Sequence, residues 1–172
     1  MIKYGLLTAD DEWASEHEVY DFLYALVRLL KPKVILETGY YKGGSLSAMQ
    51  RAAADNMIPT ELLSCETNGI LYENRTHKNS KPLKIHETSG THYVVKFVTG
   101  EELCRATEGV DLAFIDSSGD RVAEVQALNL APNGVVVLHD AKRPQYQAIK
   151  TLRPWKAIWE IDTVQGITVF QS

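Results

Sequence analysis

The sequence predicts an α/β fold, in which a mostly parallel β-sheet carries helices on both faces. Short apolar runs such as 34–36 and 135–138 recur along the chain, and strands that are buried on both faces have this composition. Between these runs lie segments whose apolar residues recur every three or four positions, which is the period of an amphipathic helix. Strands that alternate with helices usually pair in parallel through right-handed crossovers.

Composition narrows the class of protein. The chain has 172 residues, 45% of them hydrophobic, which predicts one domain spanning 1–172. The formal net charge is -4 and the basic residues are scattered, so we expect a small-molecule partner and no nucleic acid. The basic residues between positions 142 and 156 form either a solvated face or a site for an anionic group. No charged leader or long apolar window is present, which predicts a cytoplasmic protein without membrane association.

The first elements follow from periodicity and from capping signals. A helix is expected over 15–30, because its apolar residues fall on one face. Ser15 and Glu18 have the spacing of a capping box at its start. A buried strand at 34–36 follows, and then a glycine-rich turn leads into a second helix over 46–53.

The alternation continues to the end of the chain. We expect further strands at 61–65, 83–86, 110–115, 135–138, 155–161 and 167–170. We expect further helices at 70–78, 93–104 (broken), 122–130 and 144–152. In parallel sheets of this kind, ligands bind beyond the carboxyl ends of the strands. Candidate functional residues are therefore those that directly follow a strand.

The turn after the first strand contains Glu37, Gly39, Gly43 and Ser45. Glycine permits a sharp turn and a close approach of ligand to backbone, and the following helix offers unpaired N–H groups. The spacing matches neither the dinucleotide fingerprint G-x-G-x-x-G nor a P-loop, which would need a lysine before Ser45. A turn that merely requires glycine is the alternative interpretation.

Polar residues also follow the later strands. They are Glu66 after the second strand, Thr88 and Ser89 after the third, Asp116 after the fourth, and His139 and Asp140 after the fifth. A carboxylate in the position of Glu66 can accept hydrogen bonds from both hydroxyls of a ribose, although it could equally be a solvated side chain. Thr88 and Ser89 either contact an adenine edge or form a simple turn. His139 is either functional or a packed residue with a satisfied ring.

In this order, these motifs resemble those of the class I S-adenosylmethionine-dependent methyltransferases, and within them the small O-methyltransferase-like families. The segments that carry the resemblance are 34–39, 64–66, 110–116 and 132–140, and 166–170 resembles the antiparallel last strand of that fold. The resemblance implies a Rossmann-like sheet that is mostly parallel, with helices on both faces.

The resemblance also implies roles in holding S-adenosylmethionine. The residues that would contact or shape its site are Glu37, Thr38, Gly39, Gly43, Ser45, Glu66, Thr88, Ser89 and Asp116. Gly39 and Gly43 would line the methionine part, while Glu37 and Ser45 would fix the loop. Glu66 would hold the ribose, and Asp116 would lie near the amino group or a metal.

On the acceptor side, the resemblance implies His139 and Asp140 as catalytic residues and a divalent metal such as magnesium at Asp116 and Asp140. At two places the sequence departs from the family pattern for this side of the site. Ala141 stands where catechol-methylating relatives carry an asparagine ligand, and the segment 117–120 replaces a Gly-Asp-His sequence found in many relatives. The acceptor pocket is then either open or completed by a second subunit of a homo-oligomer.

These observations predict methyl transfer to a hydroxyl of a small molecule. The alternative is a methyltransferase-like module that binds the cofactor without transferring its methyl group. A nicotinamide-dependent oxidoreductase is disfavoured by the Gly39 to Gly43 spacing. Methylation of protein or nucleic acid is disfavoured because no Asn-Pro-Pro-Tyr type of motif follows the fourth strand.

Overall fold

The computed structural model describes residues 17–41, 43–66, 83–84, 91–96 and 98–172. Helix α1 (His17–Leu30) buries one face through Val19, Leu23 and Val27, which recur at helical spacing. The chain then enters β1 (Val34–Thr38), a strand that is buried over nearly its whole length. The predicted helix and strand are thus confirmed over the described residues, and β1 extends two residues beyond the predicted run.

The described strands form one sheet in the order β3-β4-β2-β1-β5-β6-β8-β7. The remaining strands are β2 (Thr60–Cys65), β3 (Leu83–Lys84), β4 (Thr91–Lys96), β5 (Val110–Ile115), β6 (Leu130–His139), β7 (Ala157–Ile161) and β8 (Ile167–Gln171). The central strands β4, β2, β1, β5 and β6 are parallel, whereas β3, β8 and β7 pair antiparallel with their neighbours. The chain builds outward from β1 to β4 and then returns to β5 on the other side. The order of the strands therefore reverses between β1 and β5, where sheets of this kind bind ligands.

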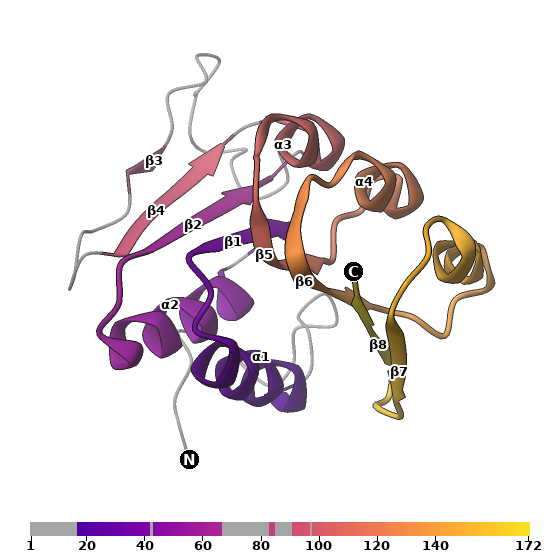
Figure 1. Ribbon diagram of the computed structural model, residues 1–172, viewed down its shortest axis with the longest axis horizontal. Coiled ribbons are helices and arrows are strands. Elements are labelled where there is room, and N and C mark those ends of the chain that lie inside the picture. Colours follow the sequence, from indigo (N-terminus) through magenta and orange to yellow (C-terminus); the bar gives the residue numbers. More distant parts are fainter. Residues whose placement is uncertain (1–16, 42, 67–82, 85–90, 97) are drawn as a thin grey trace.

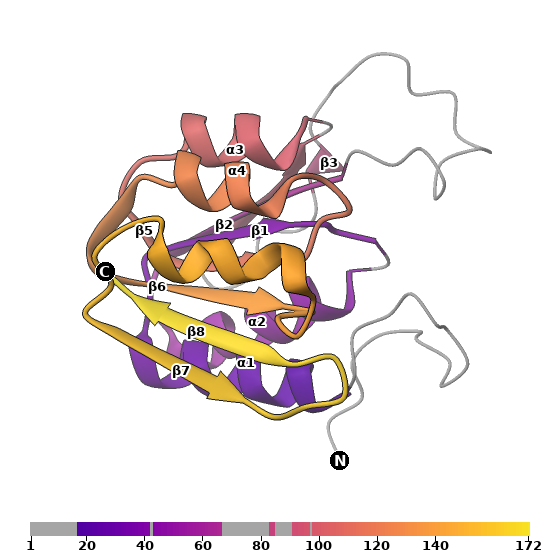
Figure 2. The same ribbon diagram turned by 90° about the vertical axis from the view of Figure 1, so that its right-hand side faces the viewer.

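Helices cover both faces of this sheet (Figures 1 and 2). Helices α1 and α2 (Gly44–Asn56) lie on one face, and α3 (Gly100–Ala106) and α4 (Arg121–Ala127) lie on the other. The 3-10 helix η2 (Pro144–Thr151) lies on the same side as α3 and α4. The predicted α/β class and the antiparallel last strand are confirmed.

Two apolar cores result from the alternation of side chains along the strands. Ile35 and Phe114 point into the core under α1 and α2, while Leu36 and Ile115 point into the core under α3 and α4. All four are fully buried. This explains why the central strands read as continuous apolar runs.

Two predictions in the middle of the chain are wrong. The segment expected as a broken helix over 93–104 contains a strand, β4, followed by the helix α3. The strand expected at 83–86 is a strand over its described residues, Leu83–Lys84, but it pairs antiparallel with β4, and β4 takes the place beside β2. The segment Thr91–Lys96 is rich in β-branched and aromatic residues, which favour a strand. The expected helix over 70–78 lies outside the described residues.

The helix expected over 122–130 is shorter than predicted. Helix α4 ends at Ala127, and β6 already begins at Leu130, which pairs with Val110. Leu128 and Leu130 have helical spacing, but the pairing of Leu130 with β5 ends the helix before them. The predicted helix at 144–152 is a 3-10 helix, and none of the described helices has the length and apolar character needed to cross a bilayer.

Candidate functional site

The loop after β1 is built on the backbone of two neighbouring strands. The N–H groups of Gly39 and Tyr40 both donate to the carbonyl of Cys65 at the end of β2, at 3.0 and 2.9 Å. Gly39 has a φ of 93°, and a Cβ at this position would lie 2.5 Å from the carbonyl oxygen of Asp116. Glycine is needed here because the ends of β1 and β5 approach each other closely. Gly43, with φ 75°, is the N-cap residue of α2.

Glu37 is completely buried beneath this loop. Ser45 donates a short hydrogen bond to its Oε1 atom, and Ser64 donates to Oε2 at 2.5 Å. Burial raises the pKa of Glu37 to about 7, although the two serine hydroxyls act in the opposite direction. The charges of Asp116 and Glu66 add to the increase of this pKa.

Glu66 stands directly after β2 and is 8% exposed. Its Oε2 atom accepts a hydrogen bond from the backbone N–H of Tyr41 at 2.8 Å. Tyr41 belongs to the loop after β1, so Glu66 joins the ends of two adjacent strands. Glu66 is thereby held at the edge of the sheet where the predicted ribose site would be.

A second buried carboxyl group, which the sequence did not single out, lies on the other face of the sheet. Glu124 of α4 accepts hydrogen bonds from Thr38 at 2.8 Å and from Ser117, so it links the ends of β1 and β5. Burial raises the pKa of Glu124, and the hydrogen bonds from Ser117 and Thr38 oppose this shift. A Cβ on Gly100 would lie 2.1 Å from the Glu124 carboxylate, so α3 also packs closely against it.

The ends of β5 and β6 bring a histidine and a carboxylate together. His139 Nδ1 lies 2.9 Å from Asp116 Oδ1, and the imidazole of His139 is almost fully buried beside Phe114. A carboxylate on Nδ1 favours the tautomer in which Nδ1 carries the proton, so Nε2 is the acceptor nitrogen of the neutral ring. The His139–Asp116 pair is therefore a candidate general base.

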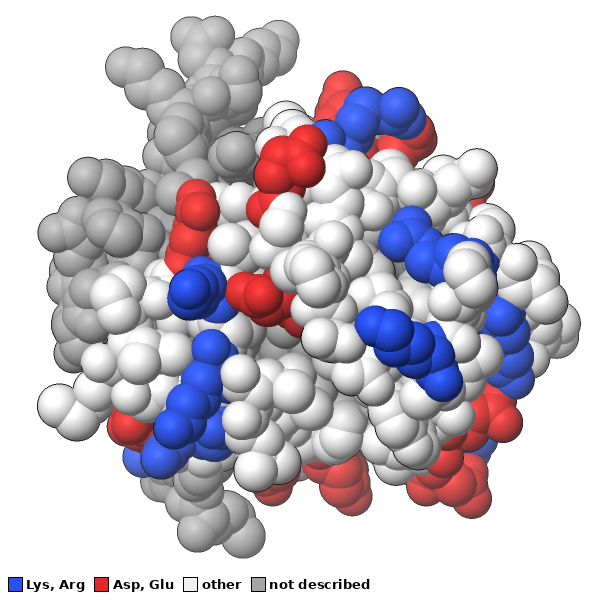
Figure 3. All heavy atoms as spheres, viewed as in Figure 1, with Lys and Arg blue, Asp and Glu red and all other residues white. Residues whose placement is uncertain are grey.

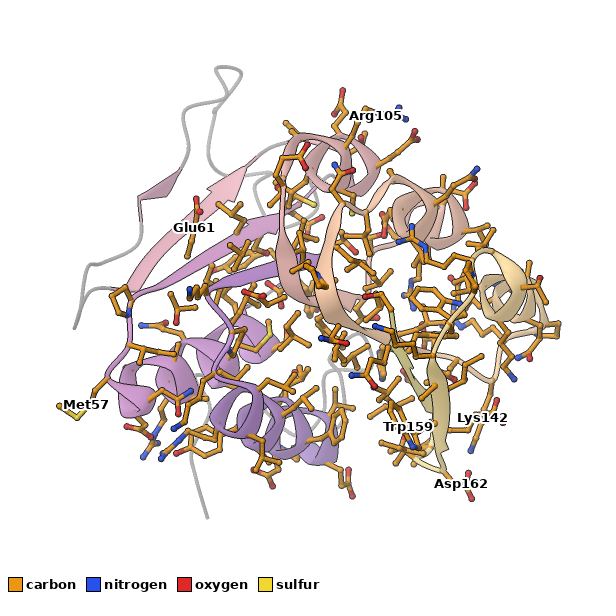
Figure 4. The ribbon with its side chains drawn as sticks, in the orientation of Figure 1. Met57, Glu61, Arg105, Lys142, Trp159 and Asp162 are labelled. Atoms are coloured by element: carbon orange, nitrogen blue, oxygen red, sulfur yellow. The ribbon has the colours of Figure 1, made fainter. Side chains whose placement is uncertain are left out.

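Asp140 follows His139 in a left-handed backbone conformation, with φ 55°. The next two N–H groups, those of Ala141 and Lys142, donate to the carbonyls of Gly166 and Gln165 in the loop between β7 and β8. Lys142 Nζ also lies 2.7 Å from Asp162 Oδ1 at this loop, and Figure 4 shows both side chains beside the hairpin. The β7–β8 hairpin therefore holds the turn that orients Asp140.

Arg121, the first residue of α4, connects the two aspartates. Its Nη2 atom lies 3.0 Å from Asp116 Oδ1 and 3.1 Å from Asp140 Oδ2. The sequence pattern did not single out this arginine. One signal could have identified Arg121. A basic residue in the first turn of a helix is destabilised by the helix dipole, so an acidic partner nearby is expected.

The predicted metal site can now be compared with these contacts. Ligand atoms of Asp116, His139 and Asp140 lie within 4.8 Å of one another, a spacing that a metal ion could bridge. The two carboxylates, however, converge on the guanidinium of Arg121, and Ala141 offers no side-chain donor. The described side chains therefore do not fit a divalent cation.

The structure places most of the predicted site residues along one edge of the sheet. Glu37, Thr38, Gly39, Gly43, Ser45, Glu66, Asp116, His139 and Asp140 all lie at or just beyond the ends of β1, β2, β5 and β6. Thr88 and Ser89 lie outside the described residues. The roles of all these residues in binding and catalysis stay predictions.

Comparisons with known proteins agree with this architecture. A family profile described as "Methyltransferase domain" matches residues 36–141, which is more than half of the chain. No curated protein matches the sequence significantly.

Several solved structures share the fold at low identity. The methyltransferase PaMTH1 of Podospora anserina, solved with SAH, is 18% identical with a TM-score of 0.66, over 95% of this chain and 81% of that one. The O-methyltransferase TomG of Streptomyces achromogenes, solved with SAM, is 17% identical with a TM-score of 0.62, over 93% and 82% of the two chains. An O-methyltransferase of Bacillus cereus, solved with SAH, is 16% identical with a TM-score of 0.61, over 94% and 84%.

The family profile, the strand order and the antiparallel last strand confirm the resemblance found in the sequence. The chain belongs to the methyltransferase domain family and has the fold of the class I S-adenosylmethionine-dependent methyltransferases.

Proposed function

We propose that this chain transfers the methyl group of S-adenosylmethionine to a hydroxyl group of a small molecule. The observation that carries the proposal is the His139–Asp116 pair, 2.9 Å apart, at the ends of β5 and β6. The adjacent strands β1 and β2 end in the glycine loop and in Glu66. A candidate proton acceptor and a candidate donor site thus share one edge of the sheet.

The donor site would be formed by the loop after β1 and by Glu66. Glu66, held by the Tyr41 N–H, would accept hydrogen bonds from the ribose hydroxyls of S-adenosylmethionine. The loop from Gly39 to Gly43 leads into the N-terminus of the 13-residue helix α2, which favours a carboxylate such as that of the methionine part. The SAM-bound and SAH-bound structures described above support this donor, because they share the fold over most of the chain.

The acceptor hydroxyl would lose its proton to His139 Nε2 as its oxygen attacks the methyl carbon. The new C–O bond forms while the S–CH₃ bond breaks, and the sulfur keeps the electron pair of that bond. The products are a methyl ether and S-adenosylhomocysteine. Asp116 would stabilise the protonated imidazole, since its carboxylate is already hydrogen-bonded to Nδ1.

A small-molecule acceptor is supported by the distribution of charge. On the face shown in Figure 3, several basic side chains gather on the right-hand side, but acidic side chains border them and no basic stripe crosses the described residues. A cytoplasmic location and a homo-oligomer stay predictions.

Calorimetry with S-adenosylmethionine and S-adenosylhomocysteine tests the donor site. We expect Glu66→Ala to weaken the binding of both ligands about 10- to 100-fold, because the two ribose hydroxyls would lose their acceptor. Glu61→Ala is the matched control: Glu61, labelled in Figure 4, is an exposed residue of β2, the strand that Glu66 follows, and this variant should bind normally. Absence of measurable heat with wild-type protein at high ligand concentration would contradict the proposal.

A cofactor-binding module without transfer activity is the second candidate. The observation that favours it is Arg121, which engages the same oxygen of Asp116 that contacts His139. An arginine on this oxygen reduces the ability of Asp116 to stabilise a protonated imidazole. Binding of S-adenosylmethionine without a methylated product across a broad panel of hydroxylated acceptors would favour this second function.

A further inference from the structure

We propose that Arg121 takes the place of a divalent cation in this site. The site would then work without a metal and would accept an isolated hydroxyl group, with no need for two adjacent oxygens on the acceptor. This inference rests on the proposed methyl transfer for the acceptor class. The role of Arg121 itself can be tested without any transfer.

The position of the guanidinium is the first argument. Asp116 and Asp140 come from two neighbouring strands, and their carboxylates converge on the same nitrogen, Nη2, at 3.0 and 3.1 Å. Two carboxylates that converge on one point are typical of a cation site. Here the cation is the guanidinium of Arg121, which is part of the protein itself.

The anchoring of Arg121 is the second argument. Nε donates to the carbonyl of Ser117 at 2.7 Å, and Nη1 donates to the carbonyl of His139 at 2.8 Å. The guanidinium also stacks over the ring of Tyr146, at 5.0 Å from its centroid, and the side chain is only 5% exposed. Because these contacts hold every nitrogen of the guanidinium, a metal ion could not displace it without breaking all of them.

Charge is the third argument. Arg143 also contacts Asp140, at 3.1 Å, so two arginines face the two carboxylates of Asp116 and Asp140. The charges of these four side chains cancel before any metal enters. A divalent cation would add two positive charges beside the buried guanidinium of Arg121, which is unfavourable, whereas the repulsion from Arg143, which is 55% exposed, is screened by solvent.

The hydrogen-bonding capacity of Arg121 limits how many oxygens of the methyl acceptor it can bind. A guanidinium has five N–H groups, and the contacts with Ser117, His139, Asp116 and Asp140 use four of them. A bound metal can hold two adjacent oxygens of one acceptor in its open positions. Arg121 can support at most one oxygen, so adjacent hydroxyls should bring no advantage.

Titration with manganese tests the role of Arg121 directly. Chelator-treated full-length protein is titrated with MnCl₂, and binding is followed by calorimetry and by the electron paramagnetic resonance signal of free Mn²⁺. We expect no saturable binding below about 1 mM and no change of melting temperature with EDTA. Saturable binding of Mn²⁺ to the wild-type chain that Asp116→Asn abolishes would overturn the proposal.

A gain of metal binding tests the same idea in the opposite direction. The double variant Arg121→Ala/Ala141→Asn removes the guanidinium and adds an amide oxygen, so it should bind Mn²⁺ at least about tenfold more tightly than wild type. The control is Arg105→Ala/Ala141→Asn, in which the arginine removed is the exposed residue of α3 labelled in Figure 4. This control should not bind. If the Arg121 variant does not fold, the manganese titration of the wild-type protein still tests the proposal.

The acceptor class is tested with pairs of aromatic acceptors that carry one hydroxyl or two adjacent hydroxyls. We expect EDTA to leave the transfer rate unchanged, and we expect the monohydroxy member of each pair to be methylated. Transfer that requires added Mg²⁺ and adjacent hydroxyls would overturn the proposal. Absence of any transfer would contradict the proposed function instead, while the manganese titration would still report on Arg121.

Discussion

Gly39 is a glycine because of a neighbouring strand. Its positive φ would be tolerable for some other residues at a modest cost, but a Cβ would meet the backbone of Asp116 and Ser117 at 2.5 to 2.9 Å. Backbone atoms at the end of a central strand cannot move aside easily. The requirement for glycine is therefore first structural, and any benefit for ligand approach is additional.

We expect Gly39→Ala to lower the free energy of unfolding by about 3 kcal/mol, because strain and a backbone clash combine. Gly109→Ala is the matched control, since Gly109 also has a positive φ, 63°, but nothing lies within 4 Å of its added Cβ. The control should lose only about 1 kcal/mol. Urea denaturation measures both values, and equal losses in the two variants would contradict the clash.

Glu37 connects burial with pH dependence. Its pKa of about 7 in the folded chain lies above the ordinary glutamate value of 4.5. Between these two pH values, the folded state therefore holds a proton that the unfolded state has released. The stabilisation from this proton is complete below about pH 4.5. It is lost as the pH rises through about 7.

We expect Glu37→Gln to remove this pH dependence. As the pH rises from 4.5 to 8, the wild type should lose about 3 kcal/mol of unfolding free energy relative to the variant. Urea denaturation at a series of pH values measures the difference, and Glu61→Gln, an exposed change on β2, serves as control. A difference that stays constant across this range would show that Glu37 is not protonated in the folded chain.

Helix α4 is the element that completes the site. Asp120 caps its N-terminus by accepting hydrogen bonds from the N–H groups of Val122 and Ala123, at 3.0 and 3.1 Å. The cap fixes where the helix begins, and Arg121 and Glu124 both project from its first turns. One short helix thus supplies a cation to Asp116 and a carboxyl group to the ends of β1 and β5.

We expect Asp120→Ala to cost about 1 kcal/mol of stability through loss of the cap, whereas Asp120→Asn, which keeps a side-chain acceptor, should cost only a few tenths. If α4 positions the site, the alanine variant should also weaken donor binding more than the asparagine variant does. Thermal denaturation and calorimetry together check this. Equal effects of the two substitutions on stability would contradict the capping role.

At the scale of the whole molecule, the sheet couples two cores. Phe114 lies in the core under α1 and α2, and Phe170 lies in the core under α3 and α4. Both side chains are fully buried, and each core uses alternate residues of the same central strands. Neither core can therefore be lost while the other keeps its strands in place.

We expect Phe114→Ala and Phe170→Ala each to cost about 3 to 5 kcal/mol and to lower the midpoint of one shared unfolding transition. Val164→Ala, which changes a side chain that is 82% exposed, should change stability by less than about 0.5 kcal/mol. Circular dichroism and tryptophan fluorescence should report the same midpoint in each variant. Separate midpoints for the two probes would show that the cores unfold independently.

The central strands and the residues that follow them could be predicted from the sequence. Apolar runs such as 34–36 predict a strand that is buried on both faces, and the rule for parallel sheets then places Glu66 and Asp116 at the same edge. These signals are local, so a single sequence contains them. Local signals failed where strand and helix preferences compete, as in Thr91–Lys96 and at Leu130.

The sequence by itself determined the fold class, the buried strands and the list of residues at their ends, because each depends on the periodicity of neighbouring residues. Only the tertiary structure decided what those residues contact. Arg121 reaches Asp116 and Asp140, and Glu124 reaches Thr38, across separations in the chain that no local pattern records. Charge neutralisation in a buried cluster depends on distances in space, and the folding of α4 against the ends of β5 and β6 sets those distances.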